Sequence, residues 1–301
     1  MNVSLCIATY RRTDRLALLL DDLAAQTRPP DELVIVDNDP DASAEAVVTT
    51  RVAAGLPFPV KYDRQPVKNI SLTRNRSVAL ASGDWIAFID DDERAPANWL
   101  DRLCTAIDDY AADGVLGPVV PVLPVDAPAW IRRGRFYDWT RLRSGQAIPR
   151  NRLRFGNLIL RASLLRGEAP FDPAYGLTGG EDGDLLSRLA QAGARLVWCD
   201  EAVVHEPVEP ARLSLGWLLR RALRGGQDFA RHTLAGRYGA NGAGTRLRLL
   251  ARAGVQLLAA MALTLLSLPF GLHHAAHWMT RASANLGKLS IFWGWHYREY
   301  A

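Results

Sequence analysis

Four acidic residues follow an apolar run directly in the sequence WIAFIDDDE, where Asp90, Asp91, Asp92 and Glu93 succeed residues 85–89. Adjacent carboxylates repel one another, and the end of a buried strand is a costly place for them unless something neutralises their charge. Because alternate side chains of an extended chain point the same way, Asp90 and Asp92 can face one ion while Asp91 faces elsewhere. Mg²⁺ and Mn²⁺ take oxygen ligands, and Mg²⁺ commonly combines one or two carboxylates with substrate phosphates. The run therefore suits a metal–diphosphate complex; a solvated acidic turn before the next helix is the alternative.

The elements around this run alternate between strand-like and helix-like segments. Strands are expected at 3–9, 32–37, 57–63 and 84–90, and helices at 13–27 (with Thr13 or Asp14 as N-cap), 42–54 and 70–81. Nearly continuous apolar strands indicate a sheet covered on both faces, and the alternation with helices indicates parallel pairing. Such doubly wound α/β folds bind ligands at the carboxyl ends of their strands, where Asp37 and the acidic run both lie.

The next segments are less regular. Residues 118–154 are rich in Pro, Gly and Arg and read as a long irregular loop, a kind that often serves as a lid or binding loop. Residues 154–165 resume strand-then-helix character. The sequence GGEDGDLLSRLAQAG at 179–193 predicts a glycine turn that opens a helix, with a further strand after it.

Composition changes after Pro210. From Arg212 to Arg252 there are nine arginines and one acid, Asp228. This local basic balance favours an anionic partner such as phospholipid or diphosphate. No recognised nucleic-acid motif accompanies the arginines, so nucleic acid is not predicted as a partner.

The segment from Ala253 to Thr280 contains no Asp, Glu, Lys or Arg. A helix over 254–272 would be about 28 Å long at ~1.5 Å per residue, close to the thickness of a hydrocarbon core. LPFG at 268–271 and the histidines that follow interrupt it, which favours a membrane hairpin or in-plane interfacial helices. A single span and an ordinary buried or oligomerising helix remain open. Aromatic residues fit a membrane interface here, namely Trp278, Trp293, Trp295, Tyr297 and Tyr300.

Six segments occur in the order found in family-2 glycosyltransferases: CIATYRR (6–12), VIVDND (34–39), NISLTRNRSVALASGDWIAFIDDDE (69–93), FGNLILR (155–161), GGEDGDLLSRLAQAG (179–193) and VVHEP (203–207). The chain resembles that family, and more narrowly the bacterial exopolysaccharide glycosyltransferases of the succinoglycan-biosynthesis, ExoM-like group. The resemblance implies a GT-A fold, a Rossmann-like doubly wound mixed sheet, over residues 1–210. Residues 211–301 would form a basic, amphipathic and apolar helical region that associates with a membrane.

The resemblance also implies which residues bind the donor. Thr9 and Tyr10 would line the nucleotide pocket, with Tyr10 stacking on the base. Asp37 would hydrogen-bond the base or ribose, and Arg74 would offset phosphate charge. A loop aromatic, a turn residue and a helix-surface arginine are the respective alternatives.

The acidic run matches the family's DXD element. Asp90 and Asp91 would contact the nucleotide sugar, and Asp90 and Asp92 would hold the divalent cation, Mg²⁺ or Mn²⁺, with Asp92 as the principal ligand. His205 would be a third ligand, and a purely structural histidine is its alternative.

Asp182 matches the catalytic base of the family, and Glu181 would orient the acceptor. The base would remove the proton of the attacking hydroxyl on the side opposite the leaving diphosphate, so that single displacement inverts the anomeric centre. Acids that merely favour a helix start are the alternative. Weaker expectations place further residues near the acceptor or its diphosphate: Trp130, Asn157, Arg220, Arg221 and Arg224.

The predicted function is therefore an inverting, metal-dependent glycosyltransferase of exopolysaccharide biosynthesis. It would move a single hexose from a nucleotide sugar, UDP-glucose or a similar UDP-hexose, to a polyprenyl-diphosphate-linked oligosaccharide. The enzyme would sit on the cytoplasmic face of the inner membrane, as a peripheral, monotopic or hairpin-anchored protein. No QxxRW motif of processive synthases is present. The alternatives are a catalytically silent subunit of a polysaccharide assembly complex and a metal-dependent nucleotidyltransferase, but CIATYRRTDR lacks the glycine-rich phosphate loop of the latter.

Overall fold

The computed structural model describes residues 1–167 and 169–299, so Tyr300 lies outside the described residues. The chain forms two compact units. The first contains residues 1–120 and 140–206, and the second contains residues 121–139 and 207–299. Residues 121–139 group with the helical unit because Ile131 and Tyr137 share a small core with Val208 and Leu218. The functional division at residue 210 stays a prediction.

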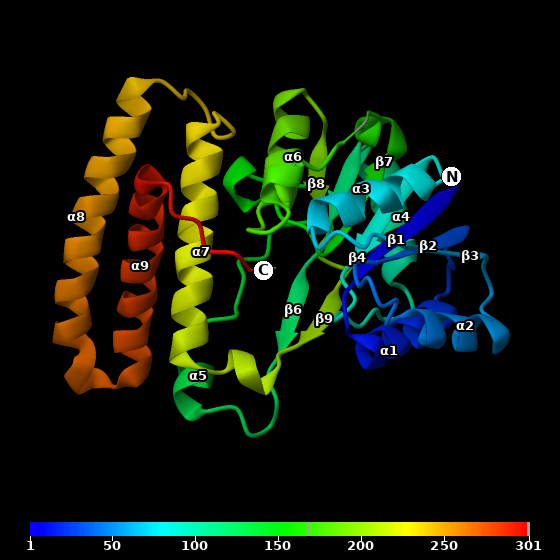
Figure 1. Ribbon diagram of the computed structural model, residues 1–301, viewed down its shortest axis with the longest axis horizontal. Helices are drawn as coiled ribbons and strands as arrows, with labels where there is room; N and C mark the ends of the chain where they lie inside the picture. Colours follow the sequence, from blue (N-terminus) through cyan, green and yellow to red (C-terminus); the bar gives the residue numbers. More distant parts are fainter. Residues whose placement is uncertain (168, 300–301) are drawn as a thin grey trace. The chain divides into compact units, whose positions relative to one another are not determined.

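The first unit is built on a seven-stranded sheet with the order β3-β2-β1-β4-β7-β5-β8 (Figure 1). Its strands are β1 (Val3–Thr9), β2 (Glu32–Asp37), β3 (Val60–Arg64), β4 (Trp85–Ile89), β5 (Gly114–Leu116), β7 (Asn157–Arg161) and β8 (Leu196–Trp198). β7 runs antiparallel to β4 and β5, and the other neighbours are parallel. The predicted α/β class with a mixed sheet is confirmed.

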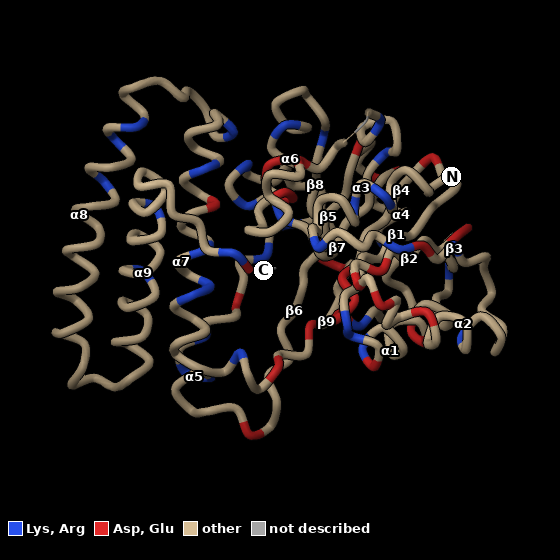
Figure 2. The backbone as a smooth tube through the Cα atoms, viewed as in Figure 1, with Lys and Arg blue, Asp and Glu red and all other residues tan. Residues whose placement is uncertain are grey.

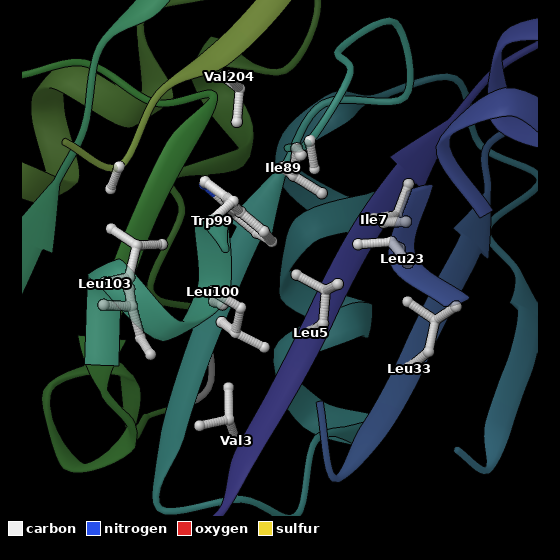
Figure 3. Close-up of a cluster of buried hydrophobic side chains, with 14 of the residues drawn as sticks. Val3, Leu5, Ile7, Leu23, Leu33, Ile89, Trp99, Leu100, Leu103 and Val204 are labelled. Carbon is white, nitrogen blue, oxygen red and sulfur yellow. The ribbon is translucent and has the colours of Figure 1, made fainter. Parts of the chain in front are cut away.

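Helices cover both faces of this sheet, as the continuous apolar strands require. One face carries α1 (Thr13–Ala24), α2 (Glu45–Ala53) and α4 (Trp99–Tyr110), and the other carries α3 (Ile70–Leu80) and α6 (Glu181–Gln191). Side chains alternate along β1, so Leu5 packs with the first set while Cys6 packs with the second. Figure 3 shows Leu5 and its neighbours in the first of these cores.

Two expectations are corrected by the structure. Neither Thr13 nor Asp14 is the N-cap of α1; Arg12 precedes the helix, and its side chain turns toward the acidic run instead of capping. The segment 118–154 is not irregular throughout, because it contains β6 (Val119–Val122), α5 (Ala129–Gly134) and a 3₁₀ turn, Arg150–Arg152. β6 pairs with β9 (Val204–Pro207) in a separate two-stranded sheet.

The second unit is mainly a layer of three long helices, α7 (Leu215–Leu234), α8 (Ala243–Ser267) and α9 (Leu272–Ser290), with α9 between the other two (Figure 1). Arginines are spread along α7, whereas most of α8 carries no charge (Figure 2). Within the described chain, one helical stretch, Ala243–Phe270, is long and apolar enough to cross a membrane, and only 17% of its most apolar window is buried.

Candidate active site

The acidic run lies where β4 ends, beside the end of its parallel neighbour β1. Thr9 Oγ1 donates a hydrogen bond to Asp91 Oδ2 at 2.8 Å. Arg12 Nη1 donates to Asp91 Oδ1 at 2.9 Å and to Asp92 Oδ2 at 3.0 Å. An arginine from the loop after β1 therefore neutralises part of the charge that the sequence concentrates at this strand end.

The three aspartates of the run differ in exposure. The side chain of Asp90 is 45% exposed, whereas those of Asp91 and Asp92 are 5% and 8% exposed. Asp92 also lies 3.9 Å from Arg15 Nη1. Asp90, rather than the predicted principal ligand Asp92, is thus the carboxylate of the run most open to a ligand.

His205 lies near the run because its backbone pairs with that of Arg94, with N–O distances of 2.8 and 2.9 Å. Across residues 1–167 and 169–299, however, no three or more His, Cys, Asp or Glu side chains are grouped so that they could hold a metal ion. Cation binding by the predicted set of Asp90, Asp92 and His205 therefore stays a prediction. In this structure Asp90 forms an ion pair with Arg74, and Asp92 forms one with Arg12.

The chemistry of the acidic run nevertheless fits a hard divalent cation. Its donors are carboxylate oxygens, of which Mg²⁺ needs only one or two when a substrate supplies phosphate oxygens. Burial, reinforced by Asp90 and Asp92, raises the pKa of Glu93 well above its usual range. Burial also raises the pKa of Asp91, although Arg12 opposes the shift. Negative charge is therefore costly at this strand end, and a bound cation would relieve that cost.

Arg74 joins the acidic run to the start of α6. Its Nη2 lies 3.3 Å from Asp90 Oδ1, and its Nη1 donates a hydrogen bond to Glu181 Oε1. The buried guanidinium also lies over the ring of Phe155, 4.3 Å from the ring centroid. The structure thus links three predicted site residues, which come from α3, from the end of β4 and from α6.

The start of α6 is set by two glycines with positive φ, Gly179 (82°) and Gly180 (94°), a conformation that favours glycine. Asp182 follows in the first turn and is half-buried. Its Oδ2 accepts a hydrogen bond from the backbone N–H of Phe155 at 3.0 Å, and its Oδ1 accepts one from Gly183 at 2.7 Å. These two N–H groups fix the orientation of the Asp182 carboxylate, and both of them are uncharged donors.

Two predicted site residues use their side chains in hydrogen bonds within the protein. Asp37 is fully buried, and its oxygens accept hydrogen bonds from two backbone N–H groups and from the Tyr62 hydroxyl. Asn157 is also buried; it accepts from the Trp99 indole at 2.8 Å and donates to two backbone carbonyls. Both side chains organise loops in this structure, so their contacts with donor and acceptor stay predictions.

Two cations lie close to the ring of Tyr10. Lys68 Nζ is 4.8 Å from the centroid of its ring, and the guanidinium carbon of Arg11 is 5.3 Å from it. The predicted stacking residue is therefore accompanied by positive charge that suits a nucleotide phosphate.

The weaker predicted residues of the second unit lie among aromatic side chains. Trp130 packs edge-on against Phe136, with centroids 5.6 Å apart. The Arg221 guanidinium is 5.1 to 5.9 Å from the ring centroids of Tyr137, Trp139 and Trp217. Arg224 lies 3.6 Å from Glu299, and Arg220 is exposed. Their contacts with the acceptor or its diphosphate stay predictions.

The sequence did not assign roles to Arg12, Lys68 or Phe155. Arg12 had a usable signal, since it follows the strand that a parallel sheet would place beside the acidic run. Lys68 and Phe155 carried no such signal, because their places depend on how distant loops fold together.

A covered mixed sheet with an acidic run after a central strand, and a second carboxylate pair at a nearby helix start, is the arrangement of a glycosyltransferase with the GT-A fold. Comparison with known proteins agrees. The model of the family described as Glycosyl transferase family 2 matches residues 4–164, and the chain belongs to this family. It is thus a glycosyltransferase, as predicted.

Several relatives share much of the chain. The Succinoglycan biosynthesis protein ExoM of Rhizobium meliloti is 36% identical over 242 residues, which cover 77% of this chain and 75% of that protein. The Galactofuranosyltransferase GlfT1 of Mycobacterium tuberculosis is 31% identical over 224 residues, 66% of this chain and 68% of that protein.

Solved structures share the fold. The mannosyltransferase PcManGT from Pyrobaculum calidifontis, in complex with GDP-Man and Mn²⁺, has a TM-score of 0.64 and 18% identity, with 97% of this chain and 87% of that chain covered. S. aureus TarS in complex with UDP has a TM-score of 0.53 and 20% identity, with 99% and 93% covered. The predicted GT-A fold is confirmed.

Proposed function

We propose that this protein is an inverting, divalent-cation-dependent hexosyltransferase that acts in exopolysaccharide biosynthesis. It moves a single hexose from a nucleotide sugar, UDP-glucose, to a polyprenyl-diphosphate-linked oligosaccharide. The similarity to the succinoglycan protein supports the pathway, and UDP in the TarS complex supports the nucleotide. The uncharged part of α8 after Arg252 and the basic α7 support an acceptor presented at the cytoplasmic face of the inner membrane.

One observation carries this proposal. Arg74 contacts both Asp90, in the predicted donor site, and Glu181, beside the predicted base. A single buried arginine therefore connects the proposed donor site at the end of β4 to the helix that carries the proposed base. A silent subunit has no need of this buried charge network, whose burial is costly.

The proposed reaction depends on the orientation of Asp182. The N–H groups of Phe155 and Gly183 hold its carboxylate, which takes the proton of the acceptor hydroxyl as that oxygen attacks the anomeric carbon. Glu181 is buried against Arg74 and acts by positioning rather than by proton transfer. Attack from the side opposite the departing diphosphate inverts the anomeric centre.

Asp90 and Asp92 are the residues that would hold the divalent cation, which supplies positive charge to the leaving diphosphate when bound. The side chain of Asp90 is partly exposed and can reach a ligand, while the side chain of Asp92 forms an ion pair with Arg12. Tyr10 and Lys68 would receive the nucleotide, the ring stacking on the base and the ammonium facing phosphate.

The test is nucleotide release by the full chain in detergent with a bacterial lipid extract, against a panel of UDP- and GDP-sugars. Each donor is assayed with Mg²⁺, with Mn²⁺ and with EDTA. We expect cation-dependent release from UDP-glucose and an acid-labile, lipid-linked product one hexose larger. Nucleotide release from a different donor would change only the identity of the donor sugar in the proposal. The absence of both nucleotide release and nucleotide binding with either cation would overturn the proposal.

A further inference from the structure

Helix α8 has an inverted burial pattern. Three of the four buried residues of α8 are small: Ala253 and Ala260 are 1% and 2% exposed, Ser267 is buried as well, and Leu249 is the large one. Large apolar residues of α8 face outward: Val255, Leu258 and Leu265 are 68% to 69% exposed. A helix at the surface of a water-soluble protein turns its large apolar side chains inward, whereas in lipid small residues mediate helix contacts and large ones face the acyl chains. The burial pattern of α8 is therefore the one expected for a helix whose outer face contacts lipid.

The contact between α7 and α9 follows the same rule. A Cβ added at Gly226 would lie 1.9 Å from the backbone oxygen of Ala284, and one added at Gly287 would meet the backbone of α7 as closely. Beside this contact, Gln227 Nε2 donates to Ser290 Oγ at 2.7 Å inside the layer. Backbone contact through glycine and buried polar hydrogen bonds are both features of helix packing in membranes.

Charge indicates which kind of lipid surface fits. Neither α8 nor α9 contains an acidic residue. Arg246, Arg248 and Arg252 lie within the first ten residues of α8, and α9 carries Arg281 and Lys288. Long basic side chains beside an apolar face suit anionic head groups, to which they extend while their stems cover apolar surface.

The surroundings of the α8–α9 turn argue against insertion tip-first. α5 contacts α9, and Arg133 of α5 is close enough to His273, in the first turn of α9, to interact with it electrostatically. Tip-first insertion would carry Arg133 and its exposed neighbour Arg132 toward the hydrocarbon core, which is costly for arginine. Contact along the side of α8 leaves these arginines outside.

We propose that α8 docks lengthwise on an anionic bilayer, with its outward stripe in the boundary between head groups and acyl chains. From Leu247 to Leu266 the stripe would run about 29 Å along the surface at ~1.5 Å per residue. Its members are Leu247, Val255, Leu258, Ala262, Leu265 and Leu266. The inference deepens the membrane localisation of the proposed function, and vesicle binding tests it without any sugar transfer.

Depth measurements distinguish lengthwise docking from tip-first insertion. The three cysteines, Cys6, Cys104 and Cys199, are free and buried, so a thiol-reactive fluorophore will label an introduced surface cysteine selectively. The full chain is labelled at L247C, L258C or L265C, and quenching by spin labels at known lipid depths is measured. The vesicles contain phosphatidylglycerol and phosphatidylcholine, or phosphatidylcholine alone. We expect one shallow depth for all three sites, and tighter binding to the anionic vesicles.

Other outcomes overturn the inference. Depth that increases steadily from residue 247 to residue 265 would show tip-first insertion. Labels that are shielded from a water-soluble quencher without vesicles, in a protein of dimeric mass, would show that a second copy covers α8.

A variant pair provides the second readout. L258Q combined with L265Q should weaken vesicle binding at least about tenfold, because two leucine side chains leave the apolar boundary. V52Q is the matched control, since Val52 is an exposed apolar residue of α2 in the other unit, and it should bind as the parent does. Vesicle binding by the double variant equal to that of the parent would refute docking through α8. Nucleotide release in detergent should persist in the double variant, so the membrane inference can fail while the proposed function stands.

Discussion

Arg74 and Glu181 form a buried ion pair between the middle of α3 and the first residue of α6, 107 positions apart in the sequence. Arg74 also reaches Asp90 at the end of β4. The pair therefore fixes the helix that carries Asp182 relative to the acidic run. Breaking it should disturb donor binding and acceptor activation together.

Replacing Arg74 by Gln should leave the Glu181 carboxylate buried without its guanidinium. Loss of one partner of a buried pair typically costs about 3–5 kcal/mol, so both the unfolding free energy and kcat/KM should fall in R74Q. R74Q combined with E181Q should recover part of the stability, because no charge is then left unpaired. Denaturant unfolding of the parent, the two single variants and the double variant measures the coupling; strictly additive losses would show that the two side chains do not act as a pair.

Replacing Asp182 by Asn should separate binding from transfer. The amide keeps the size of the carboxylate and one acceptor for the Phe155 N–H, so folding and nucleotide affinity should be retained. Transfer should fall at least about a hundredfold, because the proton acceptor is removed. Calorimetric titration with UDP beside single-turnover transfer makes this comparison.

D109N is the control for Asp182, because Asp109 is an exposed aspartate near the end of α4 and should behave as the parent does. A D182N enzyme that transfers sugar at the parental rate would remove Asp182 from the mechanism.

Replacing Arg12 by Gln should make the protein depend more on added cation. Arg12 bridges Asp91 and Asp92, so its loss leaves two poorly exposed carboxylates without that counter-charge. Thermal unfolding of R12Q should begin at a lower temperature than that of the parent, and MnCl₂ without nucleotide should raise its midpoint more. R94Q, which breaks an ion pair with Asp22, is the control and should show the parental response to Mn²⁺. An equal Mn²⁺ shift in R12Q and the parent would show that Arg12 does not compete with the cation.

Glu32 should make stability depend on acid pH. Burial alone would raise its pKa, but hydrogen bonds from Lys61, Ser4 and Ser82 lower the pKa to about 2. A carboxylate with a lowered folded-state pKa stabilises the fold above its unfolded value of about 4.3, and that stabilisation is lost as pH falls toward 2. E32Q should therefore cost about 2–3 kcal/mol near pH 7 and progressively less below pH 4.

Denaturant unfolding of E32Q across this pH range tests the prediction. E45Q, at an exposed position in the first turn of α2, should show a much smaller pH dependence. A cost in E32Q that stays constant from pH 7 to pH 3 would contradict the assignment.

The fold was predictable because its signal is local. β1, β2 and β4 are short apolar runs between helix-like segments, and burial on both faces is the only way to remove such strands from water. The order of the family's segments then identified the GT-A fold. The antiparallel strand β7 and the ordered elements inside 118–154 were less accessible, because their pairing depends on partners far along the chain.

The sequence by itself determined which groups are available for chemistry: the acidic run after β4, the pair Glu181 and Asp182 at a helix start, and a C-terminal stretch, 253–280, without charged residues. Only the tertiary structure decided how these groups are used. In the folded chain the side chains of Asp37 and Asn157 point inward and hydrogen-bond to the backbone. Arg12 pairs with Asp92, and Arg74 lies between Asp90 and Glu181. The physical reason is that residue type fixes charge and hydrogen-bonding capacity locally, whereas the partner that satisfies each buried polar group is chosen by the packing of distant segments.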